Sequence, residues 1–461
     1  MTTLNEHFLW GNSTSSMQTE GAWNLDGKGP SVYDIKPAGP HNADWQVAID
    51  DYHRYQEDVD LMAEMGMNCY RFQISWSRVC PDGDGEFNEA GIAYYDHLID
   101  ALLAKGIQPM ICLYHFDMPL RLAKRENGFV SRQVVDAFVR FGCEMVRRFA
   151  DRVTYWITFN EHNCFTYQPG LESGGNLTAP QDIRTLYTMS HHTLLAHARI
   201  NAFIRSHYPK LKLGGMLAYA EVYPATAQPE DIEATRAIDE FLNNNYLDIF
   251  AFGHYSPEVL HFMKQNHLDN IIQPGDLAEL TTIKSDFIAF SYYASQAIDH
   301  TKIIKDTPVN WWMEQASIPN PNLKATEWGW QIDAIGFKNV LIKIWNNTGL
   351  PVFPIENGIG VRETFDGVHQ IQDDYRVSYH RAHLQQLKAA VEIGVPVIGY
   401  LGWGLIDIPS SKGDVDKRYG AVYVNHTNQA VKDLRRIPKA SFAWFQQVFN
   451  SNGENLNDLN R

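Results

Sequence analysis

Two glutamates that follow apolar runs are the residues of this sequence best suited to acid–base chemistry. Glu356 closes the apolar part of residues 351–358 (PVFPIENG), and Glu161 closes that of residues 154–161 (TYWITFNE). Apolar and β-branched residues bounded by Pro and Asn-Gly predict a buried strand that ends at the glutamate. A single glutamate at such a place ordinarily faces solvent. Two of them predict a shared pocket, where one carboxyl can donate a proton and the other can act as base or nucleophile.

The elements that hold these glutamates follow one repeated unit, in which a helix with an apolar stripe ends at a glycine and an apolar strand follows. Helices are predicted over residues 51–65, 92–102, 134–149, 182–207, 336–346 and 374–393. Strands are predicted over residues 8–16, 68–76, 107–115, 154–161, 212–219, 286–295, 351–358 and 395–407. Eight strands, most of them separated by helices, predict the α/β class and a closed (β/α)8 TIM barrel. Since no linker interrupts the pattern, we expect a single barrel domain over residues 1–461.

In such a barrel the carboxyl ends of all strands meet at one face, where active sites lie. Glu161 then ends the fourth strand and Glu356 the seventh, so the two carboxyls are expected to lie close together. Arg71, on the second strand, is predicted to face the barrel core beside Glu356. An adjacent cation lowers the pKa of a carboxyl, so we expect Arg71 to keep Glu356 ionised.

The composition of the chain limits which binding partners and which cellular compartment we expect. The formal charge of −15 and the pI near 5.6 argue against a nucleic-acid surface, which needs clustered Lys and Arg. Five cysteines without a CxxC spacing are typical of reduced thiols. The N-terminus lacks a secretory pattern, and no apolar run is long enough to span a bilayer. We therefore expect a soluble, cytoplasmic protein that binds neither nucleic acid nor membrane. The oligomeric state is not predicted.

Two carboxyls on opposite sides of a pocket are suited to cleaving a glycosidic bond. That reaction requires an acid at the leaving oxygen and a base or nucleophile on the other side of the bond. Motifs for other chemistries are missing from the sequence: there is no HExxH, Walker loop, dinucleotide glycine pattern or G-x-S-x-G. His191 and His192 lie in a predicted helix without an acidic partner at ligand spacing, and a structural role is favoured for them. We therefore predict a carboxylate nucleophile and neither a metal nor a cofactor. Polar and aromatic groups suited to sugar hydroxyls and rings are predicted around the pocket: Gln18, Glu20, His115, Asn160, Tyr293 and Trp403.

Seven segments, taken in order, resemble the signatures of glycoside hydrolase family 1 across essentially the whole chain. They are QTEGAW (18–23), YRFQISWSR (70–78), LYHFDMP (113–119), TFNE (158–161), SYY (291–293), IENG (355–358) and residues 403–407. The resemblance implies a retaining β-glycosidase with Glu161 as acid/base and Glu356 as nucleophile. It also implies that Tyr293 is a partner of the nucleophile, and it implies the following glycone contacts: Gln18, His115, Asn160 and Trp403. Two positions depart from many members, with Phe116 in place of Trp and Ser291 in place of Asn.

The segment 403–419 (WGLIDIPSSKGDVDKRY) carries the most informative departure. Family members that act on plain sugars usually have Asn-Phe-Glu-Trp after the Asp, and that Glu would repel a 6-phosphate. Ser410, Lys417 and Tyr419 instead match the spacing in the 6-phospho-β-glycosidases of the family, where they form a phosphate cradle. The resemblance thus implies a 6-phospho-β-glucoside substrate, with a solvated basic turn as the alternative interpretation of this segment.

Several alternatives stay open at this point. Galactose-type members tend to carry Trp where Ser411 stands, which favours the gluco epimer over a 6-phospho-β-galactosidase or an enzyme that accepts both epimers. A non-catalytic sugar-phosphate binding protein is the alternative of another class, and the presence of both glutamates speaks against it. The aglycone is not predicted, although Trp312, Trp328 and Trp330 are aromatic candidates for its site.

Overall fold

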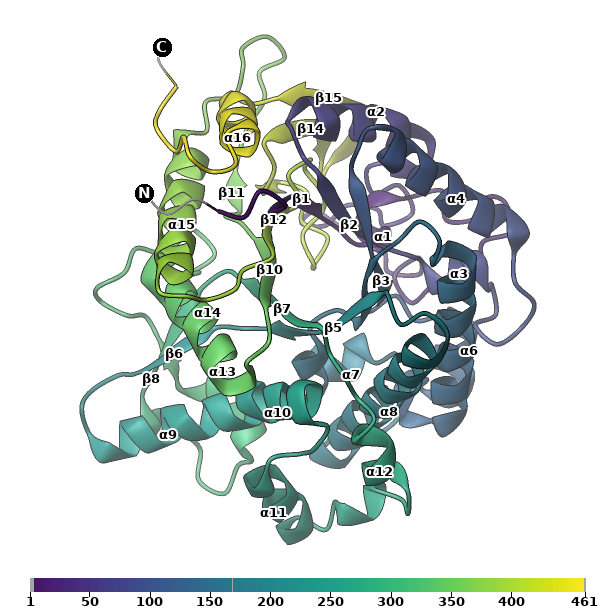
Figure 1. Cartoon of the computed structure of the whole chain (residues 1–461), viewed down its shortest axis with the longest axis vertical. Helices are drawn as coiled ribbons and strands as arrows, with labels where there is room; N and C mark the ends of the chain where they lie inside the picture. Colours follow the sequence, from purple (N-terminus) through teal and green to yellow (C-terminus); the bar gives the residue numbers. More distant parts are fainter. Residues whose placement is uncertain (1–3, 168, 460–461) are drawn as a thin grey trace.

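The computed structural model describes residues 4–167 and 169–459, and its centre is a closed barrel of eight parallel strands. The strands are β1 (Leu9–Ser13), β2 (Cys69–Gln73), β3 (Gln108–Tyr114), β4 (Tyr155–Phe159), β5 (Lys212–Ala218), β7 (Phe287–Tyr292), β10 (Val352–Asn357) and β12 (Gly399–Trp403). The barrel closes because β1 pairs with β2 on one side and with β12 on the other. Figure 1 shows the strands as an inner ring with helices around them. The predicted (β/α)8 barrel is confirmed.

The helices that cover the barrel lie where the apolar stripes predict them. The longest are α2 (Asp51–Glu64), α4 (Glu89–Ala104), α6 (Arg132–Phe149), α8 (Ile183–His207), α14 (Ala334–Thr348) and α15 (Asp374–Glu392). In α6 the Ser131 side chain accepts a hydrogen bond from the Gln133 amide and so caps the first turn. The buried face of α6 recurs at helical spacing and includes Val134, Phe138 and Phe141. Burial of this face holds the helix against the strands.

The barrel interior is packed with side chains and is not an open channel. A buried apolar cluster fills it, made of Leu9, Cys69, Met110, Cys112, Ile157, Met216, Phe287, Ala289, Phe353, Ile355 and Leu401. The fit is close, since a β-carbon at Gly214 would lie 2.3 Å from the ring of Phe287. Substrate can therefore reach the strand ends only from the mouth of the barrel.

Several peripheral elements were not predicted. A three-stranded sheet of β6 (Glu221–Pro224), β8 (Ser295–Ile298) and β9 (Ser317–Ile318) lies outside the barrel, beside α9 (Pro229–Asp239). The chain also forms a hairpin of β14 (Val422–Thr427) and β15 (Ala430–Pro438), and a short pair of β11 (Val361–Arg362) and β13 (Lys417–Arg418). Strand β10 continues one residue past Glu356, so the prediction that Glu356 is its last residue is wrong by one position.

Two features bear on the expected compartment. All five cysteines are buried and unpaired. Across residues 4–167 and 169–459, none of the helices has both the length and the apolar character needed to cross a bilayer.

Candidate active site

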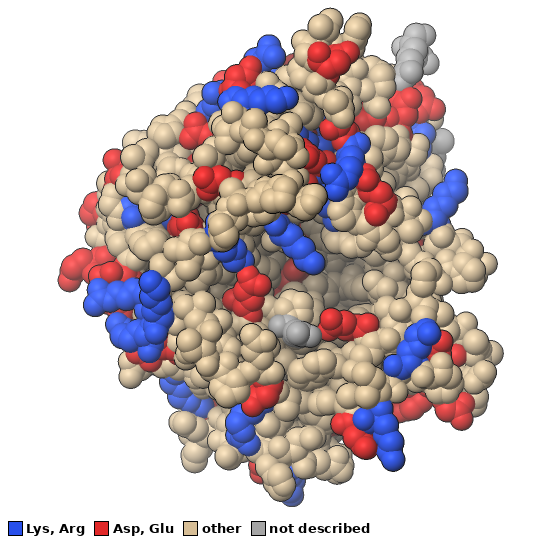
Figure 2. All heavy atoms as spheres, turned by 180° about the vertical axis from the view of Figure 1, so that it is seen from behind, with Lys and Arg blue, Asp and Glu red and all other residues tan. Residues whose placement is uncertain are grey.

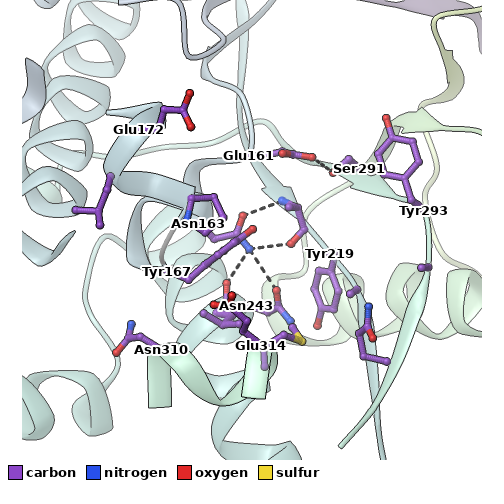
Figure 3. A pocket seen from close by; sticks show the side chains of 18 of the residues that line it. Glu161, Asn163, Tyr167, Glu172, Tyr219, Asn243, Ser291, Tyr293, Asn310 and Glu314 are labelled. Carbon is purple, nitrogen blue, oxygen red and sulfur yellow. Dashed lines mark hydrogen bonds between the residues drawn. The ribbon is translucent and has the colours of Figure 1, made fainter. Parts of the chain in front are cut away.

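The two predicted glutamates both come from the carboxyl ends of barrel strands. Glu356 lies on β10 and is 2% exposed. Glu161 follows β4 and precedes the short 3-10 helix η2 (His162–Thr166). Its φ of 41° places it in the left-handed region, which few residues other than glycine occupy, and such strain is common at functional sites. Glu161 also lines a cavity, where Figure 3 shows it beside Ser291.

Two donors hold the carboxylate of Glu356. Arg71 Nη1 lies 2.9 Å from Glu356 Oε1, and the Tyr293 hydroxyl donates to Oε2 at 2.9 Å. Arg71 is fully buried on β2, and its Nη2 donates to Asn160 Oδ1 at 2.6 Å. The predicted contacts of Arg71 and Tyr293 with Glu356 are therefore present, and Asn160 is joined to the same group.

The net effect on the pKa of Glu356 is opposite to the sequence-based expectation. Burial raises the pKa of Glu356 to about 8, and the charge of Glu161 adds to this increase. Arg71 and Tyr293 lower it but do not offset the burial. The expectation that Arg71 leaves Glu356 fully ionised is thus wrong, because a cation at 2.9 Å acts on a group that has lost its water. Arg71 contacts Glu356 and not Glu161, so its charge favours the ionised form of Glu356 more than that of Glu161.

Glu161 has only neutral partners. Ser291 Oγ donates to Glu161 Oε1 at 2.5 Å, and Cys164 Sγ lies 3.6 Å from Oε2. Burial raises the pKa of Glu161, while these two hydrogen bonds and the charge of Arg71 lower it. Among the described residues Glu161 forms no ion pair, whereas Glu356 is paired with Arg71, so the partners of Glu161 suit a proton donor and those of Glu356 suit a nucleophile.

The side chains expected to contact the sugar have the following neighbours in the structure. Gln18 Nε2 donates to the carbonyl of Pro409 at 2.7 Å, which joins the first loop to the segment that carries Ser410. The rings of His115 and Trp403 lie 5.7 Å apart. Within the described chain His115 Nδ1 and Asn160 Nδ2 are buried without a hydrogen-bond partner, so both remain available to a ligand.

Glu20 is hydrogen-bonded to two other side chains. Its carboxylate accepts from Arg78 Nε at 2.7 Å and from the Tyr95 hydroxyl. Each oxygen of Glu20 thus already accepts one hydrogen bond within the protein, and its contact with a sugar stays a prediction.

Lys417 lies on β13 with its ammonium among aromatic rings. Lys417 Nζ is 3.5 Å from the ring centroid of Trp330, 4.9 Å from that of Trp328 and 5.5 Å from that of Tyr419. The residue is 6% exposed and has no ion-pair partner in the described ranges. Burial lowers the pKa of Lys417 to about 8. The Tyr419 ring in turn lies 6.4 Å from that of Tyr293, which connects Lys417 to the nucleophile candidate.

Ser410 and the ends of the 403–419 segment are fixed by short contacts. The Ser410 hydroxyl oxygen accepts from the Asp414 amide at 3.1 Å, so its hydrogen is free to be donated elsewhere. Within the segment, the carboxylate of Asp407 accepts a hydrogen bond from the Gly420 amide at 2.7 Å and forms an ion pair with Lys439 at 3.1 Å. Arg376 donates to the carbonyl of Tyr419 at 2.5 Å. These buried contacts hold the backbone that presents Lys417 and Tyr419.

A cavity of about 850 Å³ extends outward from Glu161. Its inner wall includes Ser291, Tyr293 and Trp330. Figure 2 shows its mouth as a hollow bordered by acidic and basic side chains. Of the three tryptophans considered for the aglycone, Trp330 lines this cavity, and Trp312 and Trp328 do not. The indole nitrogen of Trp312 donates to the carbonyl of Thr307.

The comparisons with known proteins agree with this geometry. Residues 1–454 match the family described as Glycosyl hydrolase family 1. The chain belongs to glycosyl hydrolase family 1. This family 1 enzyme is 39% identical to the aryl-phospho-β-D-glucosidase BglC of Bacillus subtilis, over 98% of each chain. It is 38% identical to a 6-phospho-β-glucosidase of Clostridium longisporum, over 97% of this chain and 98% of that enzyme.

A solved structure gives the same result for the fold. The β-glucosidase of Thermotoga maritima in complex with glucoimidazole superimposes with a TM-score of 0.86 at 31% identity, over 98% of this chain and 100% of that one. The chain is therefore a glycoside hydrolase with the fold of its family.

Some neighbours of Glu161 and of its cavity were not found from the sequence. Cys164 follows Glu161 by three residues, and the 3-10 turn of η2 brings its thiol back to the carboxyl. In a 3-10 turn, residues three apart lie on the same side, so this spacing could have predicted the contact between Cys164 and Glu161. Asn163 and Tyr167 line the cavity from the same turn, as Figure 3 shows, but nothing in their types predicts which way they face.

Proposed function

We propose that this glycoside hydrolase is a retaining 6-phospho-β-glucosidase, which converts 6-phospho-β-D-glucosides to glucose 6-phosphate and an aglycone or second sugar. The observation that carries the proposal is the ammonium of Lys417, which is buried and has no carboxylate partner within residues 4–167 and 169–459. The names of the two bacterial relatives, both phospho-β-glucosidases, support the same substrate class.

The chemistry of this site is suited to an anion. Burying a cation without a partner is costly, and the lowered pKa of Lys417, about 8, reflects that cost. The protein carries a net charge of −15, so its overall field repels an anion and the binding must come from local donors. Lys417 supplies a charge, and the hydroxyls of Ser410 and Tyr419 supply hydrogen bonds. A 6-phosphate fits this set, whereas a neutral 6-hydroxyl leaves the cation unpaired.

The carboxyls divide the reaction into two steps. In the first, Glu161 gives its proton to the glycosidic oxygen while a Glu356 oxygen forms a bond to the anomeric carbon, and the aglycone leaves. In the second, Glu161 takes a proton from water, the water oxygen bonds to the anomeric carbon, and the Glu356 ester breaks. Arg71 and Tyr293 stabilise Glu356 whenever it is an anion, at the start and at the end of the cycle.

The glycone side is assigned to residues around Glu356. We place the sugar hydroxyls at the unpaired atoms of His115 and Asn160, with Gln18 and Trp403 completing the site. Ser411 is exposed and stands where galactose-type members tend to carry Trp, which favours the gluco epimer. A 6-phospho-β-galactosidase remains the second candidate.

We also propose that the enzyme works in the cytoplasm. Its five buried, unpaired cysteines are typical of a reducing compartment. A phosphorylated sugar is charged and does not cross a bilayer unaided, so it must be cleaved where it is phosphorylated.

A panel of four chromogenic substrates tests the proposal. It contains β-glucosides and β-galactosides, each with and without a 6-phosphate. The 6-phospho-β-glucoside is expected to have the highest kcat/KM, and the anomer first released is expected to be β, as retention requires. Equal rates with and without the phosphate would contradict the phosphate assignment, and a faster 6-phospho-β-galactoside would replace the gluco assignment with the second candidate.

A further inference from the structure

Glu161 must be held in one orientation while its charge changes. In the proposed reaction it loses a proton in the first step and regains one in the second, and each transfer requires an oxygen aimed at the reacting centre. No cation is paired with Glu161 among the residues that the structure describes. Its hydrogen-bond partners are the hydroxyl of Ser291 and the thiol of Cys164 (Figure 3 shows the first).

Ser291 is the stronger and more rigid of the two partners. It is 2% exposed and lies on β7 between β5 and β10, in register with Ala218 and with Glu356 itself. Its Oγ is 2.5 Å from Glu161 Oε1. Cys164 is a weak donor at 3.6 Å, and its sulfur also lies 2.9 Å from the Tyr167 hydroxyl. Oε1 is therefore fixed by the barrel wall, and Oε2 is the less engaged oxygen, free to exchange a proton with the substrate.

We propose that Ser291 is a positioning residue for the acid/base, which fixes Glu161 Oε1 and favours release of the proton from Oε2. The hydroxyl can donate to Oε1 in both protonation states, since Oε1 is a carbonyl oxygen in the acid and a carboxylate oxygen in the anion. The hydrogen bond strengthens as Glu161 becomes charged, so it stabilises the transition state more than the ground state. The proposal rests on the proposed function only in taking Glu161 as the acid/base.

If Ser291 assists proton transfer from Glu161, its contribution to the rate depends on the leaving group of the substrate. A poor leaving group needs the proton of Glu161 in the transition state, whereas dinitrophenolate departs without one. Removing the hydroxyl also removes one of the groups that lower the pKa of Glu161 against its burial. The alkaline limb of the kcat/KM profile on the plain phenyl β-glucoside, whose binding does not use the Lys417 ammonium, reports loss of the proton from Glu161 and should then move to higher pH.

The test uses Ser291→Ala in the full-length enzyme, which removes a single oxygen. We expect kcat/KM for phenyl 6-phospho-β-glucoside to fall about tenfold, the value of one hydrogen bond to a charged group, while the dinitrophenyl substrate changes by less than about twofold. The alkaline limb should shift upward by a measurable fraction of a pH unit. Ser291→Thr, which keeps the hydroxyl, should restore both readouts.

Ser285→Ala is the matched control. Ser285 precedes the opposite end of β7, and its buried hydroxyl has no hydrogen-bond partner in the described chain. Neither leaving-group dependence nor pH profile should change in this variant. Equal losses on both substrates with Ser291→Ala, or an alkaline limb that does not move, would overturn the proposal.

Glu161→Gln separates this proposal from the proposed function. In that variant, kcat/KM should fall far more for the phenyl substrate than for the dinitrophenyl substrate. If it does so and Ser291→Ala does not, only the role of Ser291 is wrong. If Glu161→Gln loses rate equally on both substrates, the acid/base assignment fails, and the role of Ser291 fails with it.

Discussion

Replacement of Lys417 by methionine isolates the charge on which substrate specificity is expected to depend. Methionine keeps most of the length of the side chain and removes the ammonium, which lies over the rings of Trp328 and Trp330. A hydrogen bond to a charged group contributes about 1.5–3 kcal/mol, which corresponds to about ten- to a hundredfold in kcat/KM. We expect this loss for the 6-phospho-β-glucoside. The plain β-glucoside should keep its low rate or gain slightly, because it loses no interaction.

The lowered pKa of Lys417 adds a second signature. Phosphate binds the protonated amine, and the free amine loses its proton as the pH rises through about 8. The inhibition constant of glucose 6-phosphate should therefore be constant below this pH and weaken above it by up to about tenfold per pH unit. In Lys417→Met the inhibition should be weak at every pH. Inhibition by product is the better assay, because it does not require the two glutamates to turn over.

Lys412→Met is the control for the Lys417 experiment. Lys412 belongs to the same segment, is exposed and lines the cavity, and we expect less than about a twofold change when its charge is removed. The reasoning would be refuted if Lys417→Met slowed the phosphorylated and plain substrates in parallel. It would also be refuted if the wild-type inhibition constant did not change between neutral pH and pH values well above 8.

Four other outcomes are expected. Glu356→Ala should reduce turnover to background in a protein that still folds, and added azide should yield the α-glycosyl azide, which identifies the missing group as the nucleophile. The pH profile of kcat/KM should have two limbs, and its optimum should lie above the usual carboxyl range, because burial raises the pKa of both Glu161 and Glu356; a profile with a single limb would count against this pair. Ser410→Glu should lower the preference for the phosphorylated substrate at least tenfold, by about the repulsion of one close charge, as measured with the paired glucosides. Lys439→Met should cost up to about 3 kcal/mol of unfolding free energy in a denaturant titration, since buried Asp407 and Glu363 each lose one cation and keep only Arg418 and Arg376, respectively.

The barrel could be predicted because its strands are nearly continuous apolar runs, each bounded by turn residues. Residues 107–115 and 351–358 read as strands without reference to any partner, and they are β3 and β10. Once eight such runs alternate with helices, topology places Glu161 and Glu356 at the same face although 195 residues separate them in the sequence (356 − 161). The proximity of the site residues was thus a consequence of the fold and not of any local motif.

The energetics of the site could not be predicted in the same way. That Arg71 meets Glu356 follows from strand geometry, but the pKa of Glu356 depends on how completely water is excluded, which only the packed structure reveals. The contact between Ser291 and Glu161 depends on the left-handed backbone at Glu161, and no residue type there signals that conformation. The small sheet of β6, β8 and β9 was missed because its strands are too short to carry a periodic pattern.

The difference between Lys417 and Arg418 supports a phosphate-binding segment over a solvated basic turn. Successive residues of a strand face opposite sides, and on β13 Arg418 points toward the buried ion network, 3.8 Å from both Asp407 and Asp416. Lys417 points the other way, toward Trp330, and within the described residues meets no carboxylate. A solvated turn would leave both cations in water, and a structural cluster would pair both. One cation is paired and its neighbour is buried without a carboxylate among the described residues, which is the arrangement expected of a group that binds an anionic substrate.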